Sequence, residues 1–379
     1  MNTQIDNLLH EHRKFPPTED FAADAVATAA LYEEAKADRL GFWAHQAREL
    51  LHWETPFTRT LDWSNPPFAK WFDDGELNVA VNCLDRHVAA GNGERVALHW
   101  EGEPGDSRDV TYAELTDEVK RAANVLTELG VGEGDRVAIY LPMIPEAVVA
   151  MLAVARLGAV HSVVFGGFSS ECLRSRIDDA SAKLVITADG GWRKGKVFPL
   201  KAAVDGAIAD GKSTVEHVLV VKRGENDVEW NDRDLWWHDE LAKADAEHEA
   251  QGFEAENPLF ILYTSGTTGK PKGILHSSGG YLTQVAWTHR NVFDLHPETD
   301  VYWCTADVGW ITGHSYVAYG PLACGATVVL YEGAPTYPDA SRFWQIIERH
   351  RVSVFYTAPT ALRALMKLGD EIPRKSDLS

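Results

Sequence analysis

Short apolar segments of strand length alternate with helical segments from residue 95 onward. A capping box of Thr111 and Glu114 opens the first helix, Gly130 ends it, and Pro145 begins the second at a favoured first position. The expected strands of this first set cover 95–100, 136–141, 160–165 and 183–188, with helices at 111–129, from 145 and at 169–180. This order of strands and helices predicts a parallel sheet covered by helices.

A second set of expected elements follows an acidic stretch at 225–256. Its strands fall near 259–263, 301–304, 327–331 and 352–356, and its helices near 279–289, 341–350 and 359–368. No sequence repeat relates the two sets. Ahead of both, residues 32–51 predict one helix. Tryptophans expected to pack over the body of the protein are Trp43, Trp53, Trp63 and Trp71.

Charge and composition exclude several classes of function. The formal net charge of −20 argues against nucleic acid and anionic membranes as partners, although it fits a high-salt habitat and ordinary acidity equally well. The most apolar stretch, 147–155, is too short to span a membrane, and the N-terminus lacks the pattern of a secretory signal. The four cysteines form no C-x-x-C pair and the histidines show no H-E-x-x-H spacing. We therefore expect a cytoplasmic protein without a metal site built from its own ligands in this chain.

The segment 259–273 runs from an apolar strand into a loop suited to phosphate. Gly266 and Gly269 allow backbone N–H groups to approach an anion closely, since glycine has no Cβ. Thr264, Ser265, Thr267 and Thr268 supply hydroxyl donors, and Lys270 and Lys272 supply positive charge. The spacing is not that of a Walker loop, because the glycines are too close and Pro271 follows the lysine. A flexible, solvated loop is the alternative.

The run T-S-G-T-T-G-K-P-K-G resembles the signature loop of the adenylate-forming superfamily, which includes acyl-CoA synthetases, luciferases and peptide-synthetase adenylation domains. Further segments, at 71–72, 77–79, 82–87, 160–168, 185–189 and 302–316, resemble the acetyl-CoA synthetases and their propionyl relatives. The resemblance implies an α/β fold of two stacked, helix-covered sheets, the large N-terminal domain of the superfamily, cut before its end. It implies a Trp-rich N-terminal region at 1–90 and an AMP-binding domain at 91–379.

The resemblance also implies a reaction in two steps. Acetate attacks the α-phosphate of ATP to give acetyl-adenylate and pyrophosphate, and the CoA thiol then attacks the acyl carbon. Residues 264–270 and Lys272 would hold the β- and γ-phosphates, with Thr267 and Lys270 as the catalytic pair. Mg²⁺ would share the phosphate charge, although its glutamate ligand in the family is expected past residue 379.

Two further groups of residues match family positions. Trp310, Ile311 and Thr312 would line the acyl pocket, with Thr312 also near CoA; a loop-to-helix junction is the alternative. Arg193, Lys194, Gly195 and Lys196 would bind the CoA 3′-phosphate; a solvated basic turn is the alternative. The family more often has arginine at 196, and lysine keeps the charge but loses bidentate geometry. Thr336 stands where the family commonly has asparagine against CoA.

The family's adenine segment, ribose-binding aspartate, hinge and C-terminal lysine are all expected beyond residue 379. The sequence therefore predicts an acetate–CoA ligase, AMP-forming, in a full-length parent, with this chain alone inactive. A propionate or other short-chain acyl–CoA ligase is one alternative. A catalytically silent chain that binds nucleotide or CoA is the other. The expected partners are the small molecules acetate, ATP and CoA, with neither nucleic acid nor membrane, and the oligomeric state stays open.

Overall fold

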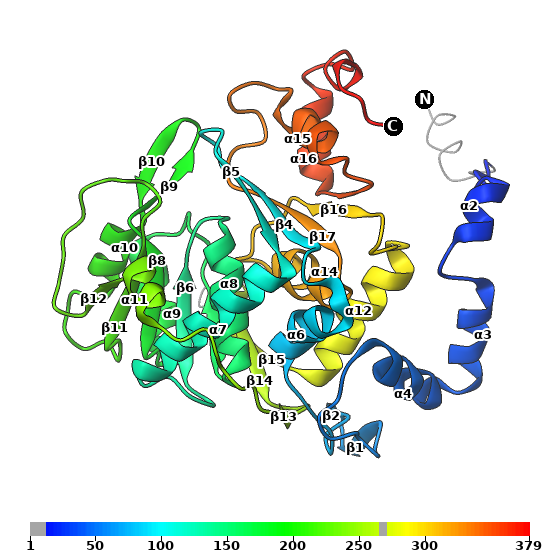
Figure 1. Cartoon of the computed structure of the whole chain (residues 1–379), viewed down its shortest axis with the longest axis horizontal. Helices are drawn as coiled ribbons and strands as arrows, with labels where there is room; N and C mark the ends of the chain where they lie inside the picture. The colour runs from blue at the N-terminus through cyan, green and yellow to red at the C-terminus, as the bar shows by residue number, and fades with distance from the viewer. Residues whose placement is uncertain (1–12, 265–270) are drawn as a thin grey trace, which may run out of the picture.

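A seven-stranded sheet forms the centre of the fold in the computed structural model, which describes residues 13–264 and 271–379 (Figure 1). Its strands lie in the order β12-β11-β8-β6-β7-β14-β15, and all neighbours are parallel except β14 and β15. The strands are β6 (Arg136–Tyr140), β7 (Val160–Val163), β8 (Leu184–Ala188), β11 (His217–Val221), β12 (Asp234–Trp236), β14 (Pro258–Thr264) and β15 (Lys272–Ser277).

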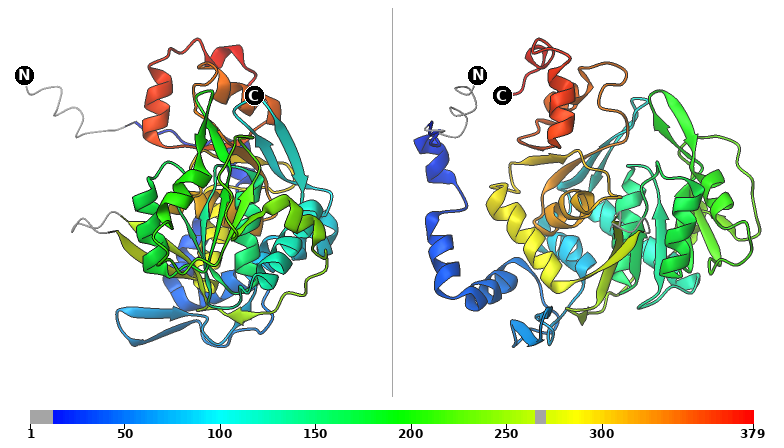
Figure 2. Two further views of the ribbon diagram at one scale, coloured as in Figure 1. Left: turned by 90° about the vertical axis from the view of Figure 1, so that its left-hand side faces the viewer. Right: turned by 180° about the vertical axis from the view of Figure 1, so that it is seen from behind.

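Helices cover both faces of this sheet, as Figure 2 shows from the side. One layer holds α7 (Tyr112–Glu128), α8 (Pro145–Arg156) and α11 (Trp237–Lys243), and the other holds α9 (Ser170–Ala180) and α10 (Leu200–Ala207). The expected capping box is present: the Glu114 N–H donates to Thr111 Oγ1 at 3.2 Å, and the Thr111 N–H donates to Glu114 Oε2 at 2.8 Å. The apolar stretch 147–155 is the buried middle of α8.

The second sheet has five strands in the order β18-β16-β17-β4-β5. They are β4 (Val96–Glu101), β5 (Ser107–Thr111), β16 (Val301–Cys304), β17 (Thr327–Tyr331) and β18 (Val354–Tyr356). Alternate residues of a strand point to opposite faces, so Tyr302 joins the main core while Trp303 faces a smaller one. The smaller core is completed by α15 (Arg342–His350) and α16 (Pro359–Met366).

The order of strands along the chain does not separate the two sheets, because each sheet takes strands from both the earlier and the later part of the chain. β4 precedes the strands of the seven-stranded sheet but pairs with β17 in the other sheet. The prediction that the strand at 95–100 joins the strands that follow it in one sheet was therefore wrong. β14, from the second set of expected strands, pairs instead with β7. The interleaving ties the two sheets together.

A buried carboxylate anchors α15 to the five-stranded sheet. Glu101, the last residue of β4, is fully buried. Three side chains of α15 surround it: the guanidinium groups of Arg342 at 2.9 Å and Arg349 at 2.7 Å, and the imidazole of His350 at 2.8 Å. Burial raises the pKa of Glu101, but the hydrogen bond with His350 and the arginine charges outweigh it and hold the pKa below its ordinary value.

The N-terminal region departs from the expected single helix at 32–51. It forms α3 (Ala29–Ala37) and α4 (Arg39–Leu50), because Asp38 ends one helix and caps the next by accepting the Gly41 N–H at 2.9 Å. Trp63 is 52% exposed, unlike Trp43, Trp53 and Trp71, which pack against the core. Within 13–264 and 271–379, no helix is long and apolar enough to cross a membrane.

The other elements are short, with the exception of the helix α12. They are α2 (Glu19–Asp24), β1 (Leu61–Asn65), β2 (Phe68–Trp71), β3 (Glu76–Leu77), α5 (Val79–Cys83), α6 (Asp85–His87), η1 (Val88–Asn92), β9 (Gly190–Arg193), β10 (Lys196–Pro199), β13 (Phe253–Glu254), α12 (Gly279–Val292, a longer helix), α13 (Ile311–Gly313), η2 (His314–Tyr319), α14 (Gly320–Ala323) and η3 (Pro373–Lys375).

Candidate active site

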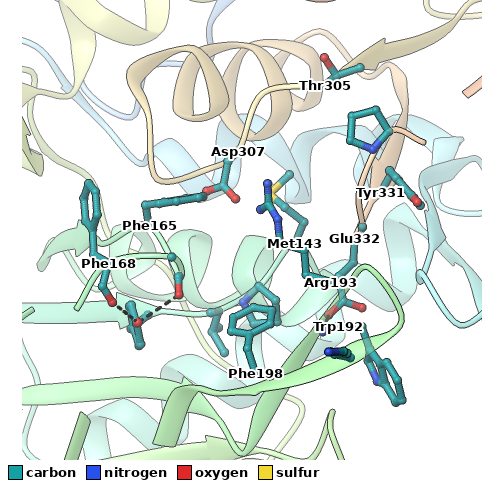
Figure 3. Close-up of a pocket in the computed structure, with 18 of the residues that line it drawn as sticks. Met143, Phe165, Phe168, Trp192, Arg193, Phe198, Thr305, Asp307, Tyr331 and Glu332 are labelled. Carbon is teal, nitrogen blue, oxygen red and sulfur yellow. Dashed lines mark hydrogen bonds between the residues drawn. The ribbon is translucent and has the colours of Figure 1, made fainter. Parts of the chain in front are cut away.

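A cavity of about 580 Å³ opens where strands of both sheets end (Figure 3). Tyr140 ends β6, Cys304 ends β16 and Tyr331 ends β17, and all three line the cavity. Ligands of α/β proteins commonly bind outside the carboxyl ends of parallel strands. The cavity therefore lies where the topology favours a binding site.

The β9–β10 hairpin brings Arg193 and Lys196 to this cavity. The two residues are directly opposite in the hairpin register, so their side chains leave the same face. Lys194 and Gly195 make the turn, with φ of +53° and +72°. A Cβ on Gly195 would lie 2.4 Å from Tyr337 Oη, and the positive φ of Gly195 strains any residue with a side chain, so glycine is favoured here. The structure thus brings the predicted CoA pair together at the cavity wall.

Glu103 holds the tip of this hairpin in place. Its side chain is buried, with Oε1 accepting the Gly195 N–H at 2.8 Å and Oε2 accepting the Ala334 N–H at 2.6 Å. The carboxylate thereby joins the hairpin to the segment after β17. Thr336 lies on that segment but is exposed, and its neighbour Pro335 lines the cavity instead. Glu103 carries no signal in the sequence, where it looks like an ordinary polar residue after a strand.

Glu332 also lines the cavity, and its charge is met by an arginine. Its Oε2 accepts from Arg223 Nε at 2.7 Å, and its Oε1 accepts the Trp192 N–H at 3.0 Å. Burial raises the pKa of Glu332, and Arg223 opposes that shift. Arg223 makes a second ion pair with Asp106 at 2.7 Å. Glu332 therefore adds little repulsion toward an anion.

Asp307 follows β16 and directs its carboxylate into the cavity, on the side that faces Arg193 (Figure 3). Its Oδ1 accepts the Gly309 N–H at 2.8 Å. Burial raises the pKa of Asp307 to about 6, while the Gly309 hydrogen bond and the Arg193 charge act to lower it. No role for Asp307 was predicted from the sequence, although its place just after a parallel strand was a usable signal.

The predicted acyl segment begins three residues after Asp307. The Trp310 ring contacts Phe165 and Phe168 at centroid distances of 5.9 and 6.2 Å, and both phenylalanines line the first cavity. Ile311 and Thr312 line a separate cavity of about 300 Å³. Arg193 and Lys196 therefore line one cavity and Ile311 and Thr312 another, whereas Trp310 lines neither and touches the first only through Phe165 and Phe168.

Two glycines let this segment pack closely. A Cβ on Gly309 would lie 2.8 Å from Phe165 Cα, and one on Gly313 would lie 2.1 Å from the Asp307 carbonyl oxygen. Both clashes would involve backbone atoms, which cannot yield as a flexible side chain can. The glycines thus hold the acyl segment against the wall of the first cavity.

The predicted phosphate-binding residues are only partly described. Thr264 ends β14 and pairs in register with Lys272, the first residue of β15, and both are exposed. Ser265, Gly266, Thr267, Thr268, Gly269 and Lys270 lie outside the described residues, so their roles stay predictions. Across 13–264 and 271–379, no three His, Cys, Asp or Glu side chains gather as metal ligands would.

Comparison with known proteins gives two family matches. The AMP-binding enzyme family matches residues 85–379, and the family described as acetyl-coenzyme A synthetase N-terminus matches residues 28–83. Acetyl-coenzyme A synthetase from Streptomyces avermitilis is 67% identical and that from Streptomyces coelicolor 66% identical, each over 379 residues. That from Mycolicibacterium smegmatis is 63% identical over 381 residues. Each alignment covers 100% of this chain but only 58%, 58% and 40% of the respective relative.

Proposed function

The chain belongs to the AMP-binding enzyme family, and from this premise we propose that it supplies the phosphate- and CoA-binding part of an AMP-forming acetate–CoA ligase. The proposed reaction joins acetate to AMP with release of pyrophosphate, and then transfers the acetyl group to CoA. The acetyl-coenzyme A synthetases at 57–67% identity support this choice of acid. A propionate or other short-chain acid is the alternative, and it would need more space beside Ile311 and Thr312.

The arrangement of Arg193 and Lys196 carries the proposal. Two cations on one face of a rigid hairpin line a cavity at the ends of the parallel strands. The buried carboxylates beside them are engaged, since Glu332 pairs with Arg223 and Glu103 accepts two backbone N–H groups. An anionic group such as the CoA 3′-phosphate would therefore meet a local positive field in a protein of formal net charge −20.

The ATP phosphates belong to the other side of the proposed site. Thr264 and Lys272 stand side by side at the carboxyl end of β14, flanking the predicted phosphate loop. Loop donors and the lysines would position the pyrophosphate as leaving group. Mg²⁺ supplies further charge neutralisation when bound, but the described residues offer it no ligand cluster, and we assign it no contact in this chain.

The test compares CoA with dephospho-CoA, which lacks the 3′-phosphate, in the full-length parent polypeptide. The double variant Arg193→Gln/Lys196→Gln should lose the preference of the wild type for CoA. Acetate-dependent exchange between pyrophosphate and ATP should stay nearly normal, since CoA takes no part in it. A matched control replaces Lys36 and Lys212, two exposed lysines outside the cavity, with glutamine. Equal use of both thiols by the wild type would overturn the CoA assignment.

A further inference from the structure

Formation of the thioester releases a proton. The S–H bond of CoA is replaced by a bond from sulfur to the acyl carbon, and the bond between that carbon and the AMP oxygen breaks. The phosphate of the acyl-adenylate already carries one negative charge, so AMP leaves as a phosphate dianion with its second charge on the new P–O⁻, and the thiol proton needs an acceptor of its own. We propose that Asp307 is the catalytic base that takes this proton, an assignment that rests on the function proposed above.

The geometry of Asp307 suits this role. One carboxylate oxygen is fixed by the Gly309 N–H at 2.8 Å, and Oδ2 has no hydrogen-bond partner among the described residues. The free oxygen belongs to a carboxylate that Figure 3 shows directed into the cavity. Asp307 therefore lines the same cavity as Arg193 and Lys196, which are proposed for the 3′-phosphate end of CoA, and it begins the segment that carries the proposed acyl residues, toward which the thiol end of CoA must extend.

The other titratable groups around the cavity are engaged or cannot accept a proton near neutral pH. They are Tyr140, Arg193, Lys196, Cys304, Tyr331 and Glu332 among the described lining residues. The Tyr140 hydroxyl donates to the Phe168 carbonyl at 2.7 Å, and the Tyr331 hydroxyl donates to the Ala334 carbonyl at 3.1 Å. Glu332 is paired with Arg223.

Burial sets the protonation of the two remaining neighbours. It raises the pKa of the Cys304 thiol to about 11, so that group is a neutral thiol. It also lowers the pKa of His314, whose segment packs against the Asp307 backbone, to about 3, so that imidazole stays uncharged. Asp307 is thus the carboxylate of the cavity that is free to accept a proton.

The protonation behaviour of Asp307 agrees with its geometry. Burial raises the pKa of Asp307 to about 6, so the group is mostly ionised at neutral pH and more basic than an ordinary aspartate. A general base works best when its pKa lies near the working pH. The proton taken by Oδ2 returns to solvent after the thioester leaves, which restores the carboxylate for the next cycle.

Asp307→Asn in the full-length parent tests the assignment. The amide is nearly isosteric and keeps an oxygen for the Gly309 N–H, but it cannot take a proton. Single-turnover transfer from acetyl-adenylate to CoA should fall about 10²- to 10⁴-fold, the usual contribution of a general base. In the wild type this rate should rise with pH through about 6, and the variant should lack that inflection.

Two measurements keep the result unambiguous. The rate of acetate-dependent pyrophosphate exchange in the variant should stay within about twofold of the wild-type rate, which would show that the adenylation site is folded. If the wild type itself gave no exchange, the proposed function would be refuted. Hydroxylamine, a neutral nucleophile, should trap the acyl-adenylate equally well with both proteins. Asp307→Glu should recover part of the thiol transfer, and Asp210→Asn serves as a remote control. Transfer to CoA within threefold of wild type, with the inflection retained, would overturn the assignment.

Discussion

Glu103 offers the sharpest test of how the hairpin is positioned. Glu103→Gln keeps the size of the side chain but replaces one carboxylate oxygen with an NH₂ group. That NH₂ must face either the Gly195 N–H or the Ala334 N–H, both of which are donors. One charge-assisted hydrogen bond is therefore lost, at about 1.5–3 kcal/mol, and the other becomes a neutral bond.

The cost should appear in CoA binding rather than in adenylation. The hairpin carries Arg193 and Lys196, so a displaced tip separates the two cations from the phosphate that they are proposed to hold. If CoA binding must restore the tip, the Kd for CoA should rise about 10- to 150-fold, since 1.4 kcal/mol corresponds to a factor of ten. Isothermal titration calorimetry with CoA measures this directly, and pyrophosphate exchange should be unchanged.

The control and the refuting result follow from the same contacts. Glu128→Gln removes an exposed carboxylate at the end of α7 and should leave the CoA affinity at the wild-type value. Dephospho-CoA should bind the Glu103 variant and the wild type with a smaller difference than CoA does. A folded Glu103→Gln protein with unchanged affinity for CoA would show that the hairpin needs no anchor.

Three further outcomes are expected. Alanine at Thr267 or Lys270 should slow adenylation by the loss of about 1.5–3 kcal/mol each, with little change in the denaturation midpoint, as rapid-quench and urea measurements can check. Glu101→Gln should destabilise the fold by about 3–5 kcal/mol, because it leaves the α15 cations around it unpaired. Because the pKa of Glu101 is lower in the folded than in the unfolded protein, its ionisation stabilises the fold at pH values above the unfolded pKa of about 4.3. This stabilisation is lost as the pH falls through the folded pKa. Urea titrations of the wild type should therefore show a loss of unfolding free energy below about pH 4, which the Glu101→Gln variant should not show. Burial lowers the pKa of His289 to about 4, so the contribution of neutral His289 to the free energy of unfolding is complete above about pH 6.5 and declines as the pH falls toward 4. His289→Gln should remove this part of the dependence of stability on pH.

Local signals in the sequence predicted eight of the twelve strands described in the two large sheets, missing β5, β11, β12 and β15, and they did not predict how the strands assemble. The capping box at Thr111 and the proline at 145 place the starts of α7 and α8, because capping depends only on residues within one turn. β4 pairs with β17, which lies more than 200 residues later in the chain, and no local sequence pattern encodes that pairing. The edge strand β15 was missed as well, since its glycine and exposed polar residues lack a buried-strand pattern.

The site divides in the same way. Arg193 and Lys196 were predicted from a local cluster of basic residues and from a resemblance to family positions, and the structure shows that this short segment is one hairpin. Asp307, Glu332 and Glu103 could not be predicted in this way, because the contacts of each depend on chain segments that are distant in the sequence and meet it only in the folded protein. For Asp307 and Glu332, a rule was nevertheless available: each stands just past the carboxyl end of a parallel strand, at 304 and 331. Polar residues at such positions merit scrutiny even without a motif.

The distribution of charge explains how an acidic chain can offer an anion site. Long-range repulsion from a formal net charge of −20 is screened within about 8–10 Å at physiological salt, so the groups lining the cavity decide the local potential. There, Glu332 is paired with Arg223 and Glu103 accepts two backbone N–H groups. Arg193 and Lys196 make no ion pair with the other described residues, which leaves their charge available. Among the lining residues that the structure describes, Asp307 remains to oppose an anion, and a bound anion raises its pKa further, so that CoA binding near pH 6 should take up protons.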